Sequence, residues 1–231
     1  MTDAAKPAPR DPFDLPDVSD LSIGVLGGTG EQGRGLALRW AKAGHRVVLG
    51  SRDADRAAAS ASELGHGVTG AANDACAAGA DVVVAAVPWA GHAALLESLT
   101  EPLSGKILID CVNPLGFDKQ GAFALPVEQG SAAQQAAELL PESRVVAAFH
   151  HISAVLLLDP AVESLDTDVL VLGDDRGATD IVQALANQIP GIRGLYGGRL
   201  RNAGQIESFT ANLISMNRRY KSHAGVRITD V

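Results

Sequence analysis

A glycine-rich stretch that follows a short apolar run constrains the fold of this chain more than any other feature. Residues 21–35 read LSIGVLGGTGEQGRG, and five of the last nine positions are glycine. Glycine loses more backbone entropy on folding than any other residue, so this density indicates a tight turn or a close approach to another molecule. Gly28 to Gly33 match G-x-G-x-x-G, the pattern that holds a dinucleotide pyrophosphate between a strand and a helix.

The rest of the chain supplies that strand and helix context. Apolar runs predict strands at 21–27, 45–52, near 68, and at 80–88, 106–113 and 144–149, separated by helices at 33–44, 53–65, around 73–79, and at 90–99 and 131–140. Continuous apolar strands between helices are typical of a parallel sheet covered on both faces. We therefore expect an α/β fold, a Rossmann-like doubly wound parallel sheet with a small C-terminal α/β domain.

Three segments follow from this pattern. Residues 1–20, rich in proline and aspartate, predict a disordered N-terminal tail, and residues 21–150 predict the dinucleotide-binding domain. Residues 151–231, with a strand at 168–173 and helices at 176–189 and 202–221, predict a smaller domain that closes a cleft. Residues 114–130 are expected to form a loop.

Composition excludes several classes of protein. The net charge of −8 argues against a general nucleic-acid or anionic-membrane binder. The two cysteines, Cys76 and Cys111, show no metal-ligand spacing, so we expect reduced thiols and no metal site. The N-terminus lacks the apolar core of a signal peptide, and no other stretch is apolar enough to span a bilayer. The sequence therefore predicts a cytoplasmic protein.

The end of the second predicted strand distinguishes NADP from NAD. NAD-specific sites place an acidic residue there for the ribose 2′-hydroxyl, about 20 residues after the glycines. Here the strand ends in Ser51 and Arg52, with Arg56 one helical turn later. These side chains can donate hydrogen bonds to a 2′-phosphate, which a carboxylate would repel. The sequence therefore favours NADP. The carboxylate of Asp53 argues against a 2′-phosphate at this place, unless Asp53 is the N-cap of the next helix.

Other strand ends carry residues suited to a ligand crevice. The strand at 80–88 runs into Val87, Pro88 and Trp89, the strand at 106–113 ends at Asn113, and the strand at 144–149 is followed by His150 and His151. Because parallel strands end at one edge of the sheet, we expect these residues to converge. His92, in the helix after Trp89, is expected to face either the ligand or the surface. Each residue has a structural role as its alternative.

At this point the chain resembles the NADPH-dependent reductases of coenzyme F420, a deazaflavin. The resemblance spans residues 21–226 and is carried by GVLGGTGEQGRGLALRWAKAGHRVVLGSR, AVPW, VVAAFHHISA, DVLVLGDD and IESFTANLISMN. Two departures stand out: Arg56 replaces a familiar lysine, and HHISA stands where HTIPA is usual. Combining the resemblance with the strand-end pattern gives the expected cofactor-binding residues: Gly28, Thr29, Gly30, Glu31, Gln32, Gly33, Ser51, Arg52, Arg56, Ala85, Val87, Pro88, Trp89, Asn113 and Ala154.

The resemblance implies direct hydride transfer between NADP(H) and coenzyme F420, with the deazaflavin in the cleft between the two domains. Both redox centres then belong to cofactors, so the protein chiefly positions two rings and excludes water. His150 is the expected catalytic residue. The last helix has an apolar face (Ile206, Phe209, Leu213 and Met216) typical of a core or a homodimer contact.

Three alternatives remain open. The first is an NADP-dependent reductase of another small substrate, such as an imine or a β-hydroxyacid. The second is a relative of the cytosolic domain of transmembrane ferric reductases. The third is a non-catalytic NADP(H)-sensing protein, which would bind the nucleotide without a pocket for a second ring.

Overall fold

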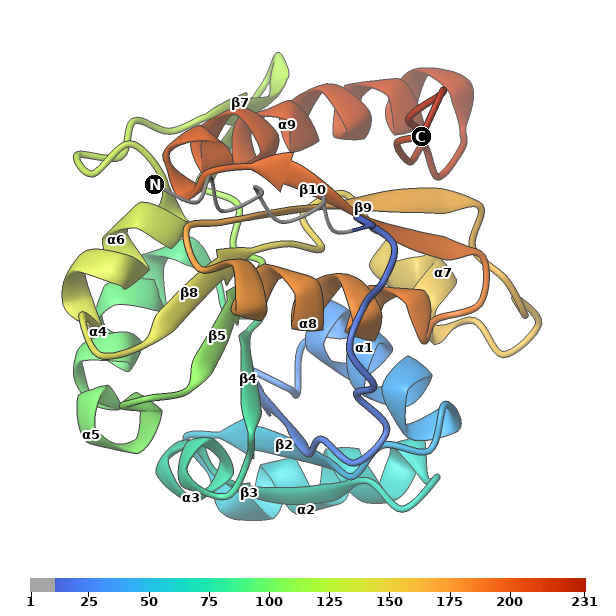
Figure 1. Cartoon of the computed structure of the whole chain (residues 1–231). Coiled ribbons are helices and arrows are strands. Elements are labelled where there is room, and N and C mark those ends of the chain that lie inside the picture. Colours follow the sequence, from blue (N-terminus) through green and yellow to red (C-terminus); the bar gives the residue numbers. More distant parts are fainter. Residues whose placement is uncertain (1–10) are drawn as a thin grey trace, which may run out of the picture.

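The fold is built on one eight-stranded sheet, which the computed structural model describes within residues 11–231 (Figure 1). Its strand order is β10-β9-β8-β5-β4-β1-β2-β3; all neighbouring pairs are parallel except β8 and β9, which are antiparallel. The strands are β1 (Ile23–Leu26), β2 (Val47–Ser51), β3 (Thr69–Ala72), β4 (Val82–Ala85), β5 (Ile107–Asp110), β8 (Arg144–Ala147), β9 (Thr167–Gly173) and β10 (Ile192–Gly198).

Helices cover both faces of this sheet. They are α1 (Glu31–Lys42), α2 (Ala54–Leu64), α3 (Asn73–Ala78), α4 (His92–Glu97), α5 (Thr100–Leu103), α6 (Ala132–Leu139), α7 (Ala154–Leu158), α8 (Arg176–Asn187) and α9 (Ala203–Tyr220), with short 3₁₀ turns η1 (Trp89–Gly91) and η2 (Leu200–Asn202). Within residues 11–231, no helix is both long and apolar enough to cross a membrane. The mixed α/β fold with a mostly parallel sheet confirms the predicted Rossmann-like class.

The alternation of side chains along each strand explains the two layers. In β4, Val82 and Val84 enter one core together with residues of α1, α7 and α8, whereas Val83 and Ala85 enter the other with residues of α3 to α6. Successive side chains of a strand point to opposite faces, so a strand buried on both faces must be apolar throughout. This requirement explains the unbroken apolar runs of the sequence.

The order of the strands reverses between β1 and β4. The chain winds outward from β1 to β2 and β3 on one side, and from β4 to β5 and β8 on the other. In open sheets of this kind, the crevice beyond the carboxyl ends of the two central strands is the usual ligand site. The topology therefore predicts a ligand site at the loops that follow β1 and β4.

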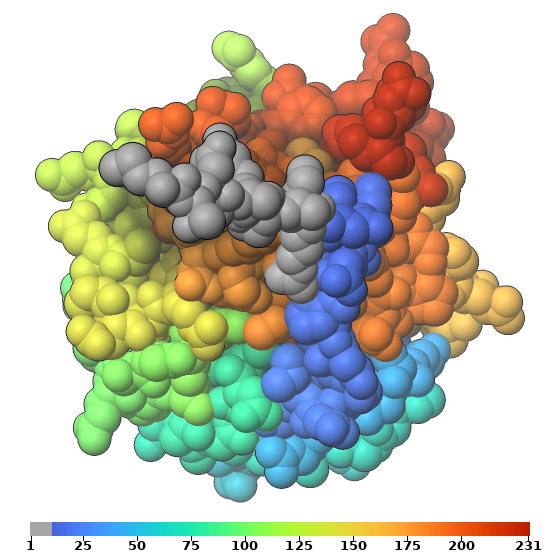
Figure 2. Space-filling model, in the orientation of Figure 1, coloured from blue at the N-terminus to red at the C-terminus, as the bar shows by residue number. Residues whose placement is uncertain are grey.

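Two features differ from the sequence-based expectations. Residues 114–130 include a hairpin, β6 (Leu115–Asp118) paired with β7 (Gly121–Ala124), rather than an unstructured loop. Val18 is 1% exposed in the core, so the folded part begins before Leu21, and residues 11–20 run along the surface (blue in Figure 2). Residues 1–10 of the expected tail lie outside the described residues.

Strands β9 and β10 continue the sheet of residues 21–150, and a domain boundary at 150 stays a prediction.

A buried arginine joins two helices on one face of the sheet. Arg39 of α1 is 4% exposed, and its guanidinium donates to four backbone carbonyls, those of Leu156, Leu157, Asp159 and Val162, at 2.6 to 3.3 Å. These carbonyls end α7 and begin the following loop, where the negative end of a helix dipole favours a cation. Arg39 therefore fixes α7 against α1.

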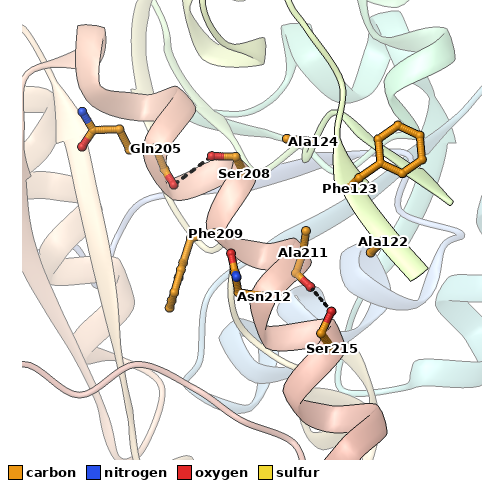
Figure 3. Close-up of a pocket in the computed structure, with 9 residues that line it drawn as sticks. All are labelled: Ala122, Phe123, Ala124, Gln205, Ser208, Phe209, Ala211, Asn212 and Ser215. Atoms are coloured by element: carbon orange, nitrogen blue, oxygen red, sulfur yellow. Dashed lines mark hydrogen bonds between the residues drawn. The ribbon is translucent and has the colours of Figure 1, made fainter. Parts of the chain in front are cut away.

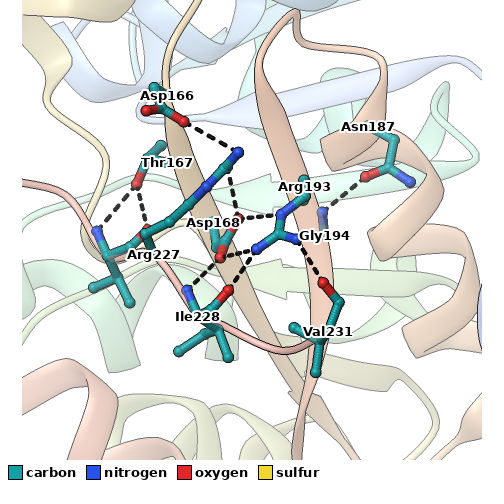
Figure 4. Close-up of polar contacts among 10 residues, drawn as sticks. Asp166, Thr167, Asp168, Asn187, Arg193, Gly194, Arg227, Ile228 and Val231 are labelled. Carbon is teal, nitrogen blue, oxygen red and sulfur yellow. Dashed lines mark hydrogen bonds and ion pairs between the residues drawn. The ribbon is translucent and has the colours of Figure 1, made fainter.

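A buried carboxylate fastens the last residues of the chain to the sheet (Figure 4). Asp168 of β9 is fully buried and accepts two hydrogen bonds from Arg193, at 2.7 and 2.8 Å, and one from Arg227 at 3.0 Å. The backbone N–H of Ile228 also donates to it at 2.6 Å. Because the charge of Asp168 is matched on several sides, its burial is tolerated.

Both cysteines are free and buried. The thiol of Cys76 lies between β2 and α3 and donates to the Val48 carbonyl at 3.4 Å. The thiol of Cys111 donates to the Ala85 carbonyl at 3.0 Å. Burial raises the pKa of Cys76 to about 11 and also raises the pKa of Cys111.

The contacts of Arg39 give a prediction about stability. Arg39→Met keeps the aliphatic stem but removes the guanidinium from four carbonyls, of which only that of Asp159 keeps another donor among residues 11–231, the Val162 N–H, so the free energy of unfolding should fall by roughly 3 kcal/mol. Urea denaturation measures this change. The exposed Lys42→Met, on the same helix, is the control and should alter stability by less than about 0.5 kcal/mol. Equal effects of the two substitutions would contradict the assigned role of Arg39.

Candidate active site

The loop after β1 touches the loop after β4. Gly27 has φ = +69°, a conformation that side chains disfavour, and a Cβ built on it would lie 2.5 Å from Val87 Cγ1 and 2.6 Å from the Ala86 carbonyl. The N–H of Gly28 donates to the Gly50 carbonyl at 3.1 Å, which joins the loop to the end of β2. The structure thus brings together three of the strand ends that sequence reasoning selected.

The other glycines of residues 27–35 divide into two kinds. A Cβ on Gly28 would lie 2.7 Å from the Val25 carbonyl, one on Gly33 would lie 2.9 Å from Gly28 Cα, and one on Gly35 would lie 2.6 Å from Leu157 Cβ. These three glycines are required by packing. Gly30 is different, because its Cβ would only reach an ordinary contact of 3.4 Å with the Gly27 carbonyl. Nothing in the described chain requires Gly30 to be glycine, as expected where a ligand comes close to the backbone.

The end of β2 has the polarity predicted for NADP. Asp53 Oδ1 accepts from the N–H groups of Asp55 and Arg56 at 3.0 and 3.1 Å, so its carboxylate is the N-cap of α2, as predicted. Arg52 and Arg56 are exposed and form no ion pair among residues 11–231. Two cations are therefore available where the sequence places a 2′-phosphate.

The segment after β4 presents apolar and aromatic groups. Val87 and Trp89 are half-buried, and Pro88 is exposed. Ala85, another expected cofactor contact, lies fully buried in the core, and its carbonyl accepts from the Cys111 N–H and thiol. Thr29 and Ala154 are half-buried and Glu31 is exposed, at the starts of the loop, of α7 and of α1. Contact of these residues with a cofactor stays a prediction.

His92 faces neither a ligand nor the surface, which corrects the expectation for this residue. It is completely buried, with Nε2 2.7 Å from Asp110 Oδ2 and Nδ1 3.0 Å from Gln135 Oε1. Each ring nitrogen faces a side-chain oxygen, an arrangement that favours the protonated imidazole. Burial alone would lower the pKa of His92, but the hydrogen bond and charge of Asp110, with the Gln135 amide, raise it. Asp110 also accepts from the Val112 N–H, so this pair shapes the turn that leads to Asn113.

A second buried carboxylate joins α9 to the start of α6. Glu207 is 2% exposed, and its two oxygens accept from the N–H groups of Ala132 and Ala133 at 2.8 and 3.1 Å. These N–H groups form the positive end of α6, which favours an anion. Burial nevertheless raises the pKa of Glu207 to about 7, against the lowering effect of the two hydrogen bonds.

The turn after β8 carries His150, the expected catalytic residue. Phe149 has φ = +64°, and its carbonyl accepts from Gln32 Nε2 at 3.1 Å. The His150 carbonyl accepts from Asn113 Nδ2 and from the Thr210 hydroxyl, both at 3.2 Å. The glycine loop, the end of β5 and α9 therefore all meet at this turn.

The side chains of His150 and His151 are buried without partners. They are 3% and 5% exposed, and none of their four ring nitrogens has a hydrogen-bond partner among residues 11–231. Burial lowers the pKa of His150 to about 3, with a smaller contribution from His151, and lowers the pKa of His151 to about 4. Buried polar atoms are nearly always paired, so two neutral imidazoles with unused nitrogens indicate a place that a polar ligand completes.

A groove of about 420 Å³ runs between β7 and α9 (Figure 3). It is lined by Ala122, Phe123, Ala124, Gln205, Ser208, Phe209, Ala211, Asn212 and Ser215. The ring of Phe209 also meets the His151 ring edge-to-face, at 6.3 Å between centroids, so the groove adjoins the His151 imidazole. Within residues 11–231, no group of three or more metal-ligating side chains is placed to hold an ion.

Comparison with known proteins gives a consistent result. A family model described as NADP oxidoreductase coenzyme F420-dependent matches residues 22–114. The F420-dependent NADP reductase of Methanothermobacter thermautotrophicus is 42% identical over 223 residues, covering 91% of this chain and 96% of that protein. The chain belongs to the F420-dependent NADP reductases. The resemblance noted in the sequence is thereby confirmed.

Two further similarities extend this result. A solved structure of a proposed F420-dependent NADP reductase from Arthrobacter sp. FB24 has a TM-score of 0.79 and 30% identity, covering 90% of this chain and 99% of its own. The rat protein Metalloreductase STEAP3 is 32% identical over 192 residues, 83% of this chain but 37% of that protein. Similarity to a metalloreductase was one of the alternatives left open by the sequence.

Sequence reasoning missed the polar groups that support the site. Asp110 ends an apolar run, ILID, and a carboxylate there signals a buried partner, but the sequence does not say which. Arg39 lies on the apolar face of a helix, which is an equally unspecific signal. Gln32 was assigned to the nucleotide alone, although its side chain also contacts Phe149. Thr210 and Glu207 carried no signal, because their partners are more than 70 residues away or depend on the tertiary fold.

The buried imidazoles give a prediction about pH. His151 stays neutral in the folded chain down to about pH 4, whereas unfolded histidine binds a proton below about pH 6.5. Stability should therefore fall on acidification by about 1.4 kcal/mol per pH unit for each such imidazole. His151→Leu should make the stability-versus-pH profile shallower by that amount between about pH 6 and pH 4.5, as measured by urea denaturation.

Two comparisons make this measurement specific. Glu207, whose pKa is raised, acts in the opposite sense, because its contribution to stability is lost as the pH rises through about 7. Glu207 is present in both the parent protein and His151→Leu, so this contribution cancels when their profiles are compared. His66→Asn, at an exposed histidine, should leave the slope unchanged. An unaltered slope in His151→Leu would mean that His151 is protonated in the folded protein.

Proposed function

We propose that this protein transfers a hydride between NADP(H) and coenzyme F420 at the carboxyl edge of the sheet. The observation that carries the proposal is Gly30, the one glycine among residues 27–35 that packing does not require. It lies in the crevice where the strand order reverses, next to elements that carry two buried, unpartnered imidazoles. The curated relatives, named as F420-dependent NADP reductases, support the same reaction.

The residues of the crevice fit NADP. Gly28 to Gly33 would hold the pyrophosphate on the N–H groups that begin α1, at the positive end of that helix. Ser51, Arg52 and Arg56 would hold the 2′-phosphate, since the carboxylate of Asp53 is occupied as an N-cap. Val87, Pro88, Trp89, Asn113 and Ala154 would line the wall beside the nicotinamide.

The protein contributes to the reaction by orienting the two coenzymes and by excluding water from them. When bound, the nicotinamide and the deazaflavin supply the carbons between which the hydride moves. The chain holds the two rings in place and keeps water from them. His150 is neutral because burial depresses its pKa, so it can donate one hydrogen bond and accept another. A neutral imidazole is better suited to forming a hydrogen bond with the second coenzyme than to acting as a proton donor in the reaction.

A homodimer and a cytoplasmic location belong to the same proposal. Phe209 and Met216 on α9 are 41% and 43% exposed, and Phe117 and Phe123 of the neighbouring hairpin are 69% and 44% exposed. An apolar surface of this kind favours a contact with a second copy. Free, buried cysteines are in keeping with a reducing compartment.

One assay separates this function from its alternatives. Mixing the protein with NADPH and oxidised F420 should bleach the visible absorbance of the deazaflavin. A reductase of another small substrate would bind NADPH without that bleaching but would turn over an imine or a keto acid. A sensing protein would bind NADPH and turn over neither. Tight NADPH binding without any transfer to F420 would refute the proposal.

The glycine loop gives a paired prediction. Gly30→Ala should leave the free energy of unfolding within about 0.5 kcal/mol of its value and weaken NADPH binding by on the order of tenfold, since its methyl group meets only the ligand. Gly28→Ala should instead destabilise the fold by about 1–3 kcal/mol through overpacking. Fluorescence titration and urea denaturation measure the two effects. A destabilised Gly30→Ala protein would show that packing requires this glycine.

The choice of nucleotide can be tested at Arg52. Arg52→Asp should weaken NADPH binding by on the order of a hundredfold, because it exchanges a phosphate donor for a like charge. NADH, which lacks the 2′-phosphate, should be affected several-fold less. Titration of both nucleotides into the same variant makes the comparison. Equal losses would mean that the 2′-phosphate does not lie at Arg52.

A further inference from the structure

The orientation of the His150 ring is set from its backbone. Neither ring nitrogen has a hydrogen-bond partner in the described chain, so no side-chain bond directs the imidazole. The preceding residue, Phe149, is held in the left-handed region at φ = +64°, although its side chain is bulky. Such a conformation costs on the order of 1–3 kcal/mol and persists only where the surroundings determine it. The groups that hold Phe149 therefore decide where His150 lies.

Helix α1 holds Phe149 at two points. Trp40 packs edge-to-face on the Phe149 ring, with 5.4 Å between the centroids. Gln32, two turns earlier on the same helix, donates from Nε2 to the Phe149 carbonyl at 3.1 Å. Among residues 11–231, Gln32 is the one donor to that carbonyl, whereas the next carbonyl, of His150, has two in Asn113 and Thr210. Loss of Gln32 therefore has no substitute.

We propose that Gln32 is a positioning residue, whose hydrogen bond to the Phe149 carbonyl couples the nucleotide-binding loop to the orientation of His150. Gln32 lies in the first turn of α1, between Gly30 and Gly33 of the segment expected to hold the pyrophosphate, so ordering of that segment by the nucleotide also orders the turn after β8. This inference rests on the proposed function, in which His150 meets the second coenzyme. It gives Gln32 a role distinct from contact with the nucleotide.

The test is Gln32→Met, which keeps the length and helix propensity of the side chain but removes the donor. We expect kcat for hydride transfer to F420 to fall by on the order of tenfold, because small misplacements of reacting groups are costly. The Kd for NADPH should stay within about twofold. In spectra of protein labelled with ¹⁵N-histidine, the His150 signals should shift or broaden. Gln188→Met, at an exposed position without a side-chain hydrogen bond in the described chain, is the matched control.

The outcomes separate this inference from the proposed function. Unchanged kcat and unchanged His150 signals in Gln32→Met would overturn it, and so would weakened NADPH binding with unchanged kcat, which would make Gln32 a nucleotide contact only. Should Gln32→Met fail to fold, Gln32→Leu also lacks the donor and adds no charge, with the same expected losses. His150→Ala tests the proposed role of His150 by itself. Full activity there, with shifted His150 signals in Gln32→Met, would remove that role and leave the coupling intact.

Discussion

The contact between the loops after β1 and β4 is the constraint on which the site depends. It requires a residue without a side chain at Gly27, against Val87, and it fixes where α1 begins. Helix α1 contacts both Phe149 and α7. In its first turn Gln32 bonds to Phe149, and in its third turn Trp40 packs on the Phe149 ring. Arg39 binds the end of α7, and Gly35 leaves room for α7 to approach. The loop after β1 and the turn that carries His150 are therefore attached to one helix.

Most of the buried charges near this framework are compensated in the way that burial demands. Asp110 has His92, Asp168 has two arginines, Arg39 has backbone carbonyls, and Glu207 has the start of α6. His150 and His151 are the exceptions, because burial keeps them neutral and leaves their nitrogens unused. These unpaired ring nitrogens contrast with the satisfied polar groups around them, and this contrast is what the proposed function explains by a bound ligand.

The sequence was sufficient for the parts of the fold with local causes. The apolar runs, the glycine turn and the Asp53 N-cap each depend on neighbouring residues, and the structure confirms them. The hairpin at 115–124 was missed because its strands are half-exposed or exposed and lack a continuous apolar pattern. His92 was misjudged because its partners, Asp110 and Gln135, are 18 and 43 residues away. The left-handed conformation of Phe149 is invisible in sequence, since it is imposed by contacts with a distant helix.

The placement of the two thiols determines how readily the protein is modified by oxidants and electrophiles. Cysteine reacts with peroxides and electrophiles as the thiolate, and exposure governs the rate. Cys76 and Cys111 are buried and their pKa values are raised, so at neutral pH both stay in the unreactive thiol form. Within residues 11–231 the protein thus carries no thiol that oxidants or electrophiles can readily modify, and the one exposed sulfur described above is the thioether of Met216.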